Sequence, residues 1–103
     1  MATSISDAYR NSVRRAVRRS SGTDVDAEID ELITEARHDL SSYVLSTKII
    51  DETDPLVLGA VKCYVRWKFG LENPDAAANK EDYLDMVDNL RHRAGYGYEE
   101  ATS

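Results

Sequence analysis

The chain has very little cysteine, proline and tryptophan, and it has no long run of apolar residues. Its 103 residues include one cysteine, two prolines and one tryptophan. A single cysteine excludes a disulfide within the chain and a cysteine-based zinc site, and it is typical of a protein made in a reducing cytosol. No stretch is as long as a membrane span, and the N-terminus lacks the apolar core of a signal peptide. We therefore expect a protein that is neither embedded in a membrane nor secreted by that route.

The length corresponds to one domain, and the charge is unevenly distributed along it. Apolar residues make up 42% and charged residues 31%, which is typical of a globular chain. The net charge of −6 argues against nucleic acid as a partner of the whole surface. Residues 1–23 nevertheless have a balance of +4, whereas residues 24–103 have a balance of −10. We therefore expect a basic N-terminal helix beside an acidic body.

Apolar residues recur at helical spacing in four segments. We predict helices over about residues 6–20, 25–43 and 55–69, and a fourth between residues 75 and 93. Residues 45–54 are predicted to be a loop in which residues 48–50 could form a short extended piece. Ser4 or Ser6 can cap the first helix, and Asp54 followed by Pro55 marks the start of the third. The sequence thus predicts an all-α fold, a compact bundle of about four helices in residues 1–94 with a flexible C-terminal tail over residues 95–103.

Side chains that could carry catalysis or bind a metal are few. His38 and His92 lie opposite the apolar stripes of their helices, so we expect both to be solvent-exposed. Asp24, Asp26 and Glu28 alternate like the start of a calcium-binding loop, but the glycine that such a loop requires is absent. We therefore expect no catalytic residue, no metal site and no cofactor, and we expect that the protein is not an enzyme.

Charged residues on the first two helices are candidates for an interface with another subunit. The basic candidates are Arg10, Arg14, Arg15 and Arg18, and the acidic ones are Glu28, Glu31 and Glu35. Three interpretations of the arginines remain open. They could form an exposed face that the second helix partly neutralises, dock onto an acidic face of a neighbouring subunit, or contact DNA phosphates.

Aromatic residues provide two further candidates. The third predicted helix is apolar around most of its circumference, and four short helices can hardly enclose all of it. Part of this surface, with Trp67 as the candidate, is therefore expected to face another subunit. Tyr96 lies between Gly95 and Gly97, and Tyr98 lies in the polar tail. We interpret them either as part of a disordered tail or as a flexible peptide that orders when it meets a partner.

The order of apolar, small and charged residues resembles that of a known family over about residues 24–98. The segments that carry the resemblance are Asp26-Ala27-Glu28-Ile29, Leu32-Ile33, Ala36-Arg37-x-Asp39-Leu40, Asp54-Pro55-Leu56-Val57-Leu58-x-Ala60-Val61, Tyr64-Val65-Arg66-x-x-Phe69-Gly70, Tyr83, Leu90 and Gly95-Tyr96. They resemble the head–tail connector family of long-tailed bacteriophages, which are small helical adaptor proteins. The arginine-rich first helix departs from the family pattern.

The resemblance implies a structural function in the virion. Such proteins form a homo-oligomeric ring, commonly twelvefold, at the neck between head and tail. They bind the portal protein on one side and a stopper or tail-completion protein on the other, and DNA passes through the ring without specific binding. With this resemblance, the tail with Tyr96 and Tyr98 becomes the candidate segment for docking to the portal. The resemblance implies no cofactor, and it implies synthesis in the cytoplasm of a host bacterium. The alternative is a small helical DNA-binding or regulatory protein that uses the arginine-rich first helix.

Overall fold

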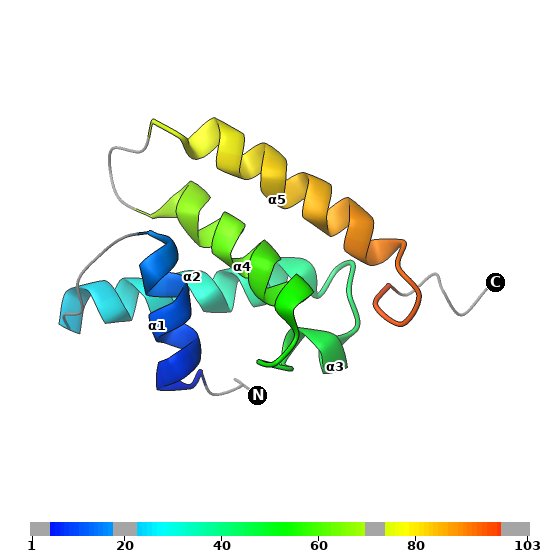
Figure 1. Cartoon of the computed structure of the whole chain (residues 1–103), viewed down its shortest axis with the longest axis horizontal. Helices are drawn as coiled ribbons and strands as arrows, with labels where there is room; N and C mark the ends of the chain where they lie inside the picture. The colour runs from blue at the N-terminus through cyan, green and yellow to red at the C-terminus, as the bar shows by residue number, and fades with distance from the viewer. Residues whose placement is uncertain (1–4, 18–22, 70–73, 98–103) are drawn as a thin grey trace.

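A computed structural model describes residues 5–17, 23–69 and 74–97 of the chain (Figure 1). Within these ranges the chain forms the helices α1 (Asp7–Ala16), α2 (Thr23–Leu40), α3 (Ser46–Ile49), α4 (Pro55–Lys68) and α5 (Ala76–Arg91). The described residues contain no β-strand, only one isolated antiparallel bridge between Val44 and Gly97. The predicted all-α class is therefore confirmed.

The helix starts follow from local capping. The Ser6 hydroxyl accepts a hydrogen bond from the backbone N–H of Tyr9 at 3.1 Å, which caps α1 as predicted. The Asp54 carboxylate accepts from the N–H groups of Leu56 and Val57 at 2.9 and 3.0 Å, and proline follows at the first helical position of α4. α1 ends at Ala16 with Val17 as its C-cap, so the predicted end at residue 20 is wrong by about one turn. Gly70, predicted to end the third helix, lies outside the described residues.

Two predictions about the second helix and the loop after it are wrong in detail. α2 begins two residues earlier than predicted and ends at Leu40 rather than near residue 43. Residues 46–49 form the one-turn helix α3 instead of an extended piece. The N–H groups of Lys48 and Ile49 donate to the carbonyl of Leu45, and this turn directs Ile49 into the core while Ile50 remains 47% exposed. Burial of a single apolar side chain therefore selects the helical turn.

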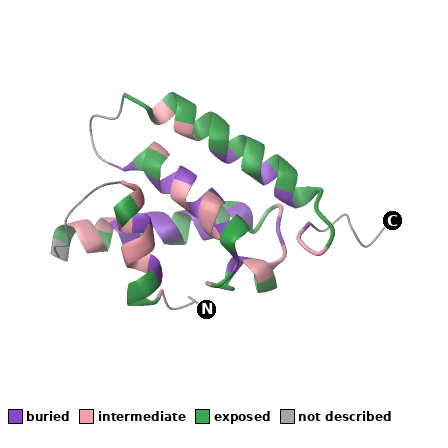
Figure 2. Ribbon diagram, in the orientation of Figure 1, coloured by how far each residue is buried: buried purple, intermediate pink, exposed green. Residues whose placement is uncertain are grey.

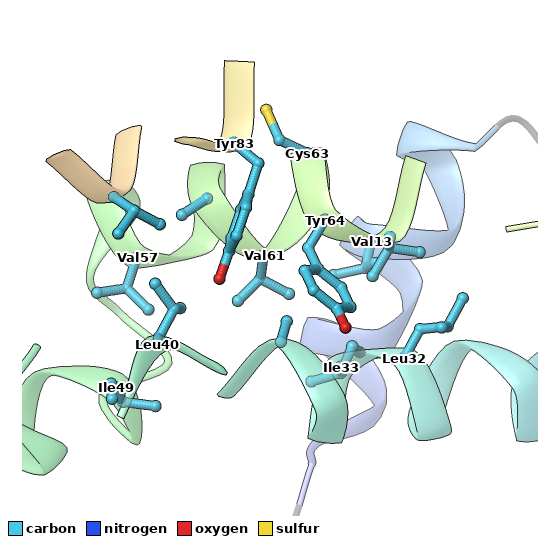
Figure 3. Close-up of a cluster of buried hydrophobic side chains, with 14 of the residues drawn as sticks. Val13, Leu32, Ile33, Leu40, Ile49, Val57, Val61, Cys63, Tyr64 and Tyr83 are labelled. Atoms are coloured by element: carbon cyan, nitrogen blue, oxygen red, sulfur yellow. The ribbon is translucent and has the colours of Figure 1, made fainter. Parts of the chain in front are cut away.

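α4 lies at the centre of the bundle. Figure 1 shows α5 on one side of α4 and α2 on the other, and α1 contacts both α2 and α4. Buried residues form a single stripe on α5, whose outer side is exposed along its length (Figure 2). In the close-up of the core, Val61 and Tyr64 of α4 point toward α2, which contributes Leu32 and Ile33 (Figure 3). The apolar character of most of the α4 surface follows from this position.

The chain after α5 is held against the body of the protein. It turns through Gly95, which has a φ of +85°, a conformation that glycine adopts readily. The carbonyl of Tyr96 accepts from the N–H of Leu45 at 2.7 Å, and the Tyr96 hydroxyl donates to Asp54 at 2.7 Å. Residues 95–97 of the predicted tail thus contact the body of the protein, while Tyr98 and the residues after it lie outside the described part of the chain. The flexibility of the tail stays a prediction.

Candidate interface surfaces

Two of the candidate arginines pair with α2 of the same chain. Nε and Nη2 of Arg10 donate to Oδ1 and Oδ2 of Asp30 at 2.6 and 3.0 Å, and Nη1 donates to Asp7 at 2.7 Å. These bonds, above all those to Asp30, raise the pKa of Arg10 above its ordinary value. Nη1 of Arg14 lies 3.8 Å from Asp26. For these two arginines the structure supports the first interpretation, in which carboxylates of the second helix neutralise the arginine charge.

The other candidate arginines are placed differently. Arg15 is exposed, and Arg18 lies outside the described residues. A DNA-binding face that used all four arginines would have to give up the pairs that Arg10 and Arg14 make with α2. Among the candidate arginines that the structure describes, Arg15 therefore has the most accessible side chain.

Acidic residues form one row along the outer side of α2, and we call this row the α2 acidic stripe. It consists of Asp24, Glu28, Glu31 and Glu35, which follow one another at intervals of three or four residues and so share a helix face. Asp24, Glu31 and Glu35 are exposed, and Glu28 is half-buried. The carboxylates that α2 directs toward α1 belong to Asp26 and Asp30 instead. The three predicted acidic interface residues thus lie together on one accessible surface.

Trp67 belongs to an aromatic cluster between α4 and α5. Its ring lies 5.4 Å from that of Tyr64 in an edge-to-face arrangement and 6.2 Å from that of Tyr83. Nζ of Lys68 and Nζ of Lys80 lie 4.3 and 5.5 Å from the Trp67 ring centroid. Trp67 is half-buried, so most of its contacts are within the chain, and its contact with another subunit stays a prediction.

The tyrosines of this cluster pack beside carboxylates of α2. The Tyr64 hydroxyl donates to Glu35 at 3.2 Å, and the Tyr83 hydroxyl donates to Asp39 at 2.5 Å. Burial, together with the charge and hydrogen bond of Glu35, raises the pKa of Tyr64 to about 12. Burial and the bond to Asp39 raise the pKa of Tyr83 as well. Both hydroxyls therefore act as neutral donors that join α4 and α5 to α2.

A buried polar network fixes the N-terminus of α1 against the loop before α4. Arg37 is only 8% exposed, its Nη2 lies 3.6 Å from Oε2 of Glu52, and its guanidinium lies 5.2 Å from the centroid of the Tyr9 ring. The N–H of Ser6 donates to the same oxygen of Glu52 at 3.0 Å. Burial opposes ionisation of Glu52, but the bonds from Ser6 and Arg37 outweigh it and lower the pKa. These groups stabilise the fold rather than offer a reactive site.

The histidines are exposed, as predicted. His92 Nδ1 lies 2.9 Å from the carbonyl of Asp88, and His38 faces solvent on α2. Among the described residues, no three of the histidine, cysteine, aspartate and glutamate side chains are grouped so that they could hold a metal ion. Of the helices described, none combines the length and the apolar character needed to cross a membrane. That the protein is not an enzyme stays a prediction.

The structure contains an apolar groove between α4 and α5 that the sequence did not predict. We call it the α4–α5 groove; it has a volume of about 320 Å³ and is lined by Pro55, Leu56, Gly59, Met86, Asn89, Leu90 and Arg93. Leu56 is 40% exposed and Met86 is 37% exposed. The signal in the sequence is Gly59, which leaves open space in the middle of an otherwise apolar helix.

Basic side chains border this groove. Lys62 and Arg66 follow Gly59 on the same face of α4 by three and seven residues. Nη2 of Arg66 lies 3.8 Å from Sγ of Cys63, which in turn lies 3.7 Å from Sδ of Met86. Arg93 lines the other end, whereas Asp82 and Asp85 of α5 each lie four residues before a lining residue, Met86 and Asn89. The groove is therefore apolar inside, with basic residues along its α4 side.

Comparison with known proteins identifies no relative. No protein-family model, no curated protein and no solved structure matches the chain.

Proposed function

We propose that this chain is a structural adaptor that joins protein subunits, and that it acts as a head–tail connector in a bacteriophage virion. The observation that carries the proposal is the α4–α5 groove. It exposes Leu56 and Met86 between two helices that are packed firmly against each other. An apolar depression with a polar border is typical of a protein-binding surface.

The positions of the two surfaces favour a ring. A head-to-tail ring requires two different faces on each subunit. The groove lies between α4 and α5, whereas the α2 acidic stripe lies on the outer side of α2, across α4 from α5 (Figure 1). One chain therefore carries two unlike surfaces that point in different directions. The α4–α5 groove is apolar with basic residues on its border, and the α2 stripe is acidic. The resemblance to connector proteins defines the assembly to test. In that assembly the ring lies at the neck of the virion and binds the portal and a stopper or tail-completion protein.

The charge of the chain favours a connector over a DNA-binding protein. A channel that DNA must traverse should not hold phosphates firmly, and a chain with a net charge of −6 repels them. Arg10 and Arg14 are bound to carboxylates of α2, so their charge is largely neutralised within the chain. We therefore propose that DNA passes the assembled ring without specific binding.

The test is the solution mass of the protein with and without the portal ring encoded in the same genome. We expect a uniform ring-sized species alone or co-migration with the portal, measured by light scattering after size exclusion. A chain that ignores the portal and instead shifts duplex DNA, with an affinity that falls steeply as salt rises, would contradict the proposal and favour the DNA-binding alternative.

A further inference from the structure

We infer that the α2 acidic stripe of one copy packs along the α4–α5 groove of the next copy, with Glu31 and Glu35 facing Lys62 and Arg66. This inference rests on the proposed assembly of the chain into a ring and names the contact that builds it.

The first argument is charge. Asp24 and Glu31 are exposed, and within the described part of the chain the side chain of neither makes an ion pair or hydrogen bond. Glu35 is also exposed, although its Oε1 accepts from the Tyr64 hydroxyl of the same chain. Arg10 and Arg14, the cations that would otherwise complement an acidic helix, are already paired with Asp30 and Asp26. Lys62 and Arg66 on the border of the α4–α5 groove form a positive surface on α4. Lys68 and Lys80 lie instead against the Trp67 ring. Complementary charges of this kind fix the register and choice of partner.

The second argument is spacing. Glu31 and Glu35 are four residues apart on one helix face, as are Lys62 and Arg66 on α4. Four residues of α-helix span about 6 Å, so the two pairs have the same separation and can meet side by side. A helix that crosses the groove in this register places each carboxylate beside one cation.

The third argument is shape. Ala27 and Thr34 lie beside Glu31 on the outer side of α2, four residues before it and three after it, and both are exposed. Their short side chains let the helix approach Leu56 and Met86 closely. The apolar stems of the glutamates can cover further apolar surface while their carboxylates reach the basic border. Gly59 has no side chain to obstruct an incoming helix, and a Cβ added there would contact Cε of Met86 at 3.5 Å.

The geometry predicts propagation rather than pairing. The stripe and the groove are different surfaces on different sides of the chain, so a copy that offers its stripe to one neighbour leaves its groove open for another. Such a heterologous contact closes into a ring when the rotation between copies permits it. A two-fold dimer would bury both pairs of surfaces at once and stop at two copies.

The experiment is charge reversal with complementation, read by sedimentation of the full chain at concentrations up to about 1 mM, where even weak contacts are populated. One variant carries Lys62→Glu and Arg66→Glu, and the other carries Glu31→Lys and Glu35→Lys. We expect each variant alone to associate at least about tenfold more weakly than wild type, because like charges then face each other. We expect the equimolar mixture to regain association, since both contacts in an alternating assembly are again complementary.

Matched controls separate position from net charge. Arg15→Glu with Arg91→Glu, and Glu81→Lys with Asp88→Lys, make the same charge changes at exposed residues away from the two surfaces. These controls should associate like wild type, and circular dichroism should show that all four variants are folded. In wild type, a carbodiimide that joins amines to carboxylates should link Lys62 of one copy to Glu31 or Glu35 of another, as identified by mass spectrometry.

Two outcomes would overturn the inference. Variants that associate as well as wild type would show that another surface makes the contact, while the proposed adaptor function would stand. A wild-type chain that remains monomeric at all concentrations and yields no such cross-link would also exclude this contact. The proposed function is judged separately, by whether the wild-type chain joins the portal ring.

Discussion

The hydroxyl of Tyr96 donates a hydrogen bond to Oδ2 of Asp54 at 2.7 Å, across 42 residues of sequence. The other oxygen of the same carboxylate accepts from the N–H groups of Leu56 and Val57 and so begins α4. Asp54 is only 7% exposed. Burial disfavours its charge, but the bonds from Tyr96 and from the two N–H groups outweigh burial and lower the pKa. One carboxylate therefore holds both the start of the central helix and the C-terminal turn.

Removing the Tyr96 hydroxyl should weaken the attachment of the C-terminal turn. We expect Tyr96→Phe to lower the urea midpoint of unfolding and to speed amide exchange at residues 95–97, since Asp54 loses one donor. Asp54→Ala should be more damaging, because it also removes the cap of α4, which typically contributes about 1 kcal/mol. Tyr43→Phe is the matched control, because Tyr43 is half-buried and its hydroxyl makes no hydrogen bond with the described residues. Equal effects of Tyr96→Phe and Tyr43→Phe would contradict the attachment.

Gly97 and Gly59 should respond in opposite ways to a methyl group. A Cβ on Gly97 would lie 1.7 Å from the carbonyl oxygen of Arg91, so the backbone would have to move. We expect Gly97→Ala to lower the free energy of unfolding by about 1–3 kcal/mol, as overpacking does. A Cβ on Gly59 would lie 3.5 Å from Cε of Met86, which is an ordinary contact. Gly59→Ala should therefore raise stability by up to about 1 kcal/mol, because alanine favours helix.

Chemical denaturation of both glycine variants measures this difference. The Gly59 variant has a second use, because its methyl group would occupy part of the α4–α5 groove. A variant that is more stable but associates less would separate the groove's role in assembly from its role in folding. Loss of stability in the Gly59 variant would show that the helix has no room there.

Alkaline pH should unfold the protein through its tyrosines. The pKa of Tyr64 is raised to about 12, and those of Tyr83, Tyr9 and Tyr96 are raised as well. The folded state thus binds protons that the unfolded state releases near pH 10, so stability is complete below pH 10 and falls as pH rises toward 12. Urea unfolding across this range, with phenolate absorbance as a second signal, should show a shallower loss for Tyr64→Phe. An equally steep loss would assign the effect to other groups.

Local sequence signals predicted the helices whose causes are local. Asp54 and Pro55 marked the start of α4, and Ser6 marked that of α1, because a cap depends on residues three or four positions away. The apolar stripe of α2 placed the acidic outer face correctly. The extended piece expected at residues 48–50 was wrong because burial of Ile49 depends on helices that lie far away in the sequence.

The features of the candidate site depend on how distant segments pack. The partner of Tyr96 is 42 residues away, and no periodicity connects it to Asp54. The α4–α5 groove needs the relative positions of two helices, so Gly59 alone could only suggest it. For Arg10 and Arg14 the sequence left three interpretations open, and the distances to Asp30 and Asp26 favour the first.

Arg10 and Arg15 should therefore contribute differently to the free energy of unfolding. Arg10 has a side chain that is 20% exposed and bonds to both oxygens of Asp30, whereas Arg15 is exposed. We expect Arg10→Ala to lower the free energy of unfolding by about 0.5–1 kcal/mol, with a smaller effect at high salt, which screens the pair. Arg15→Ala should change stability by less than about 0.5 kcal/mol. A loss of stability from Arg15→Ala equal to that from Arg10→Ala would contradict the separation of these two arginines into an internal and an accessible group.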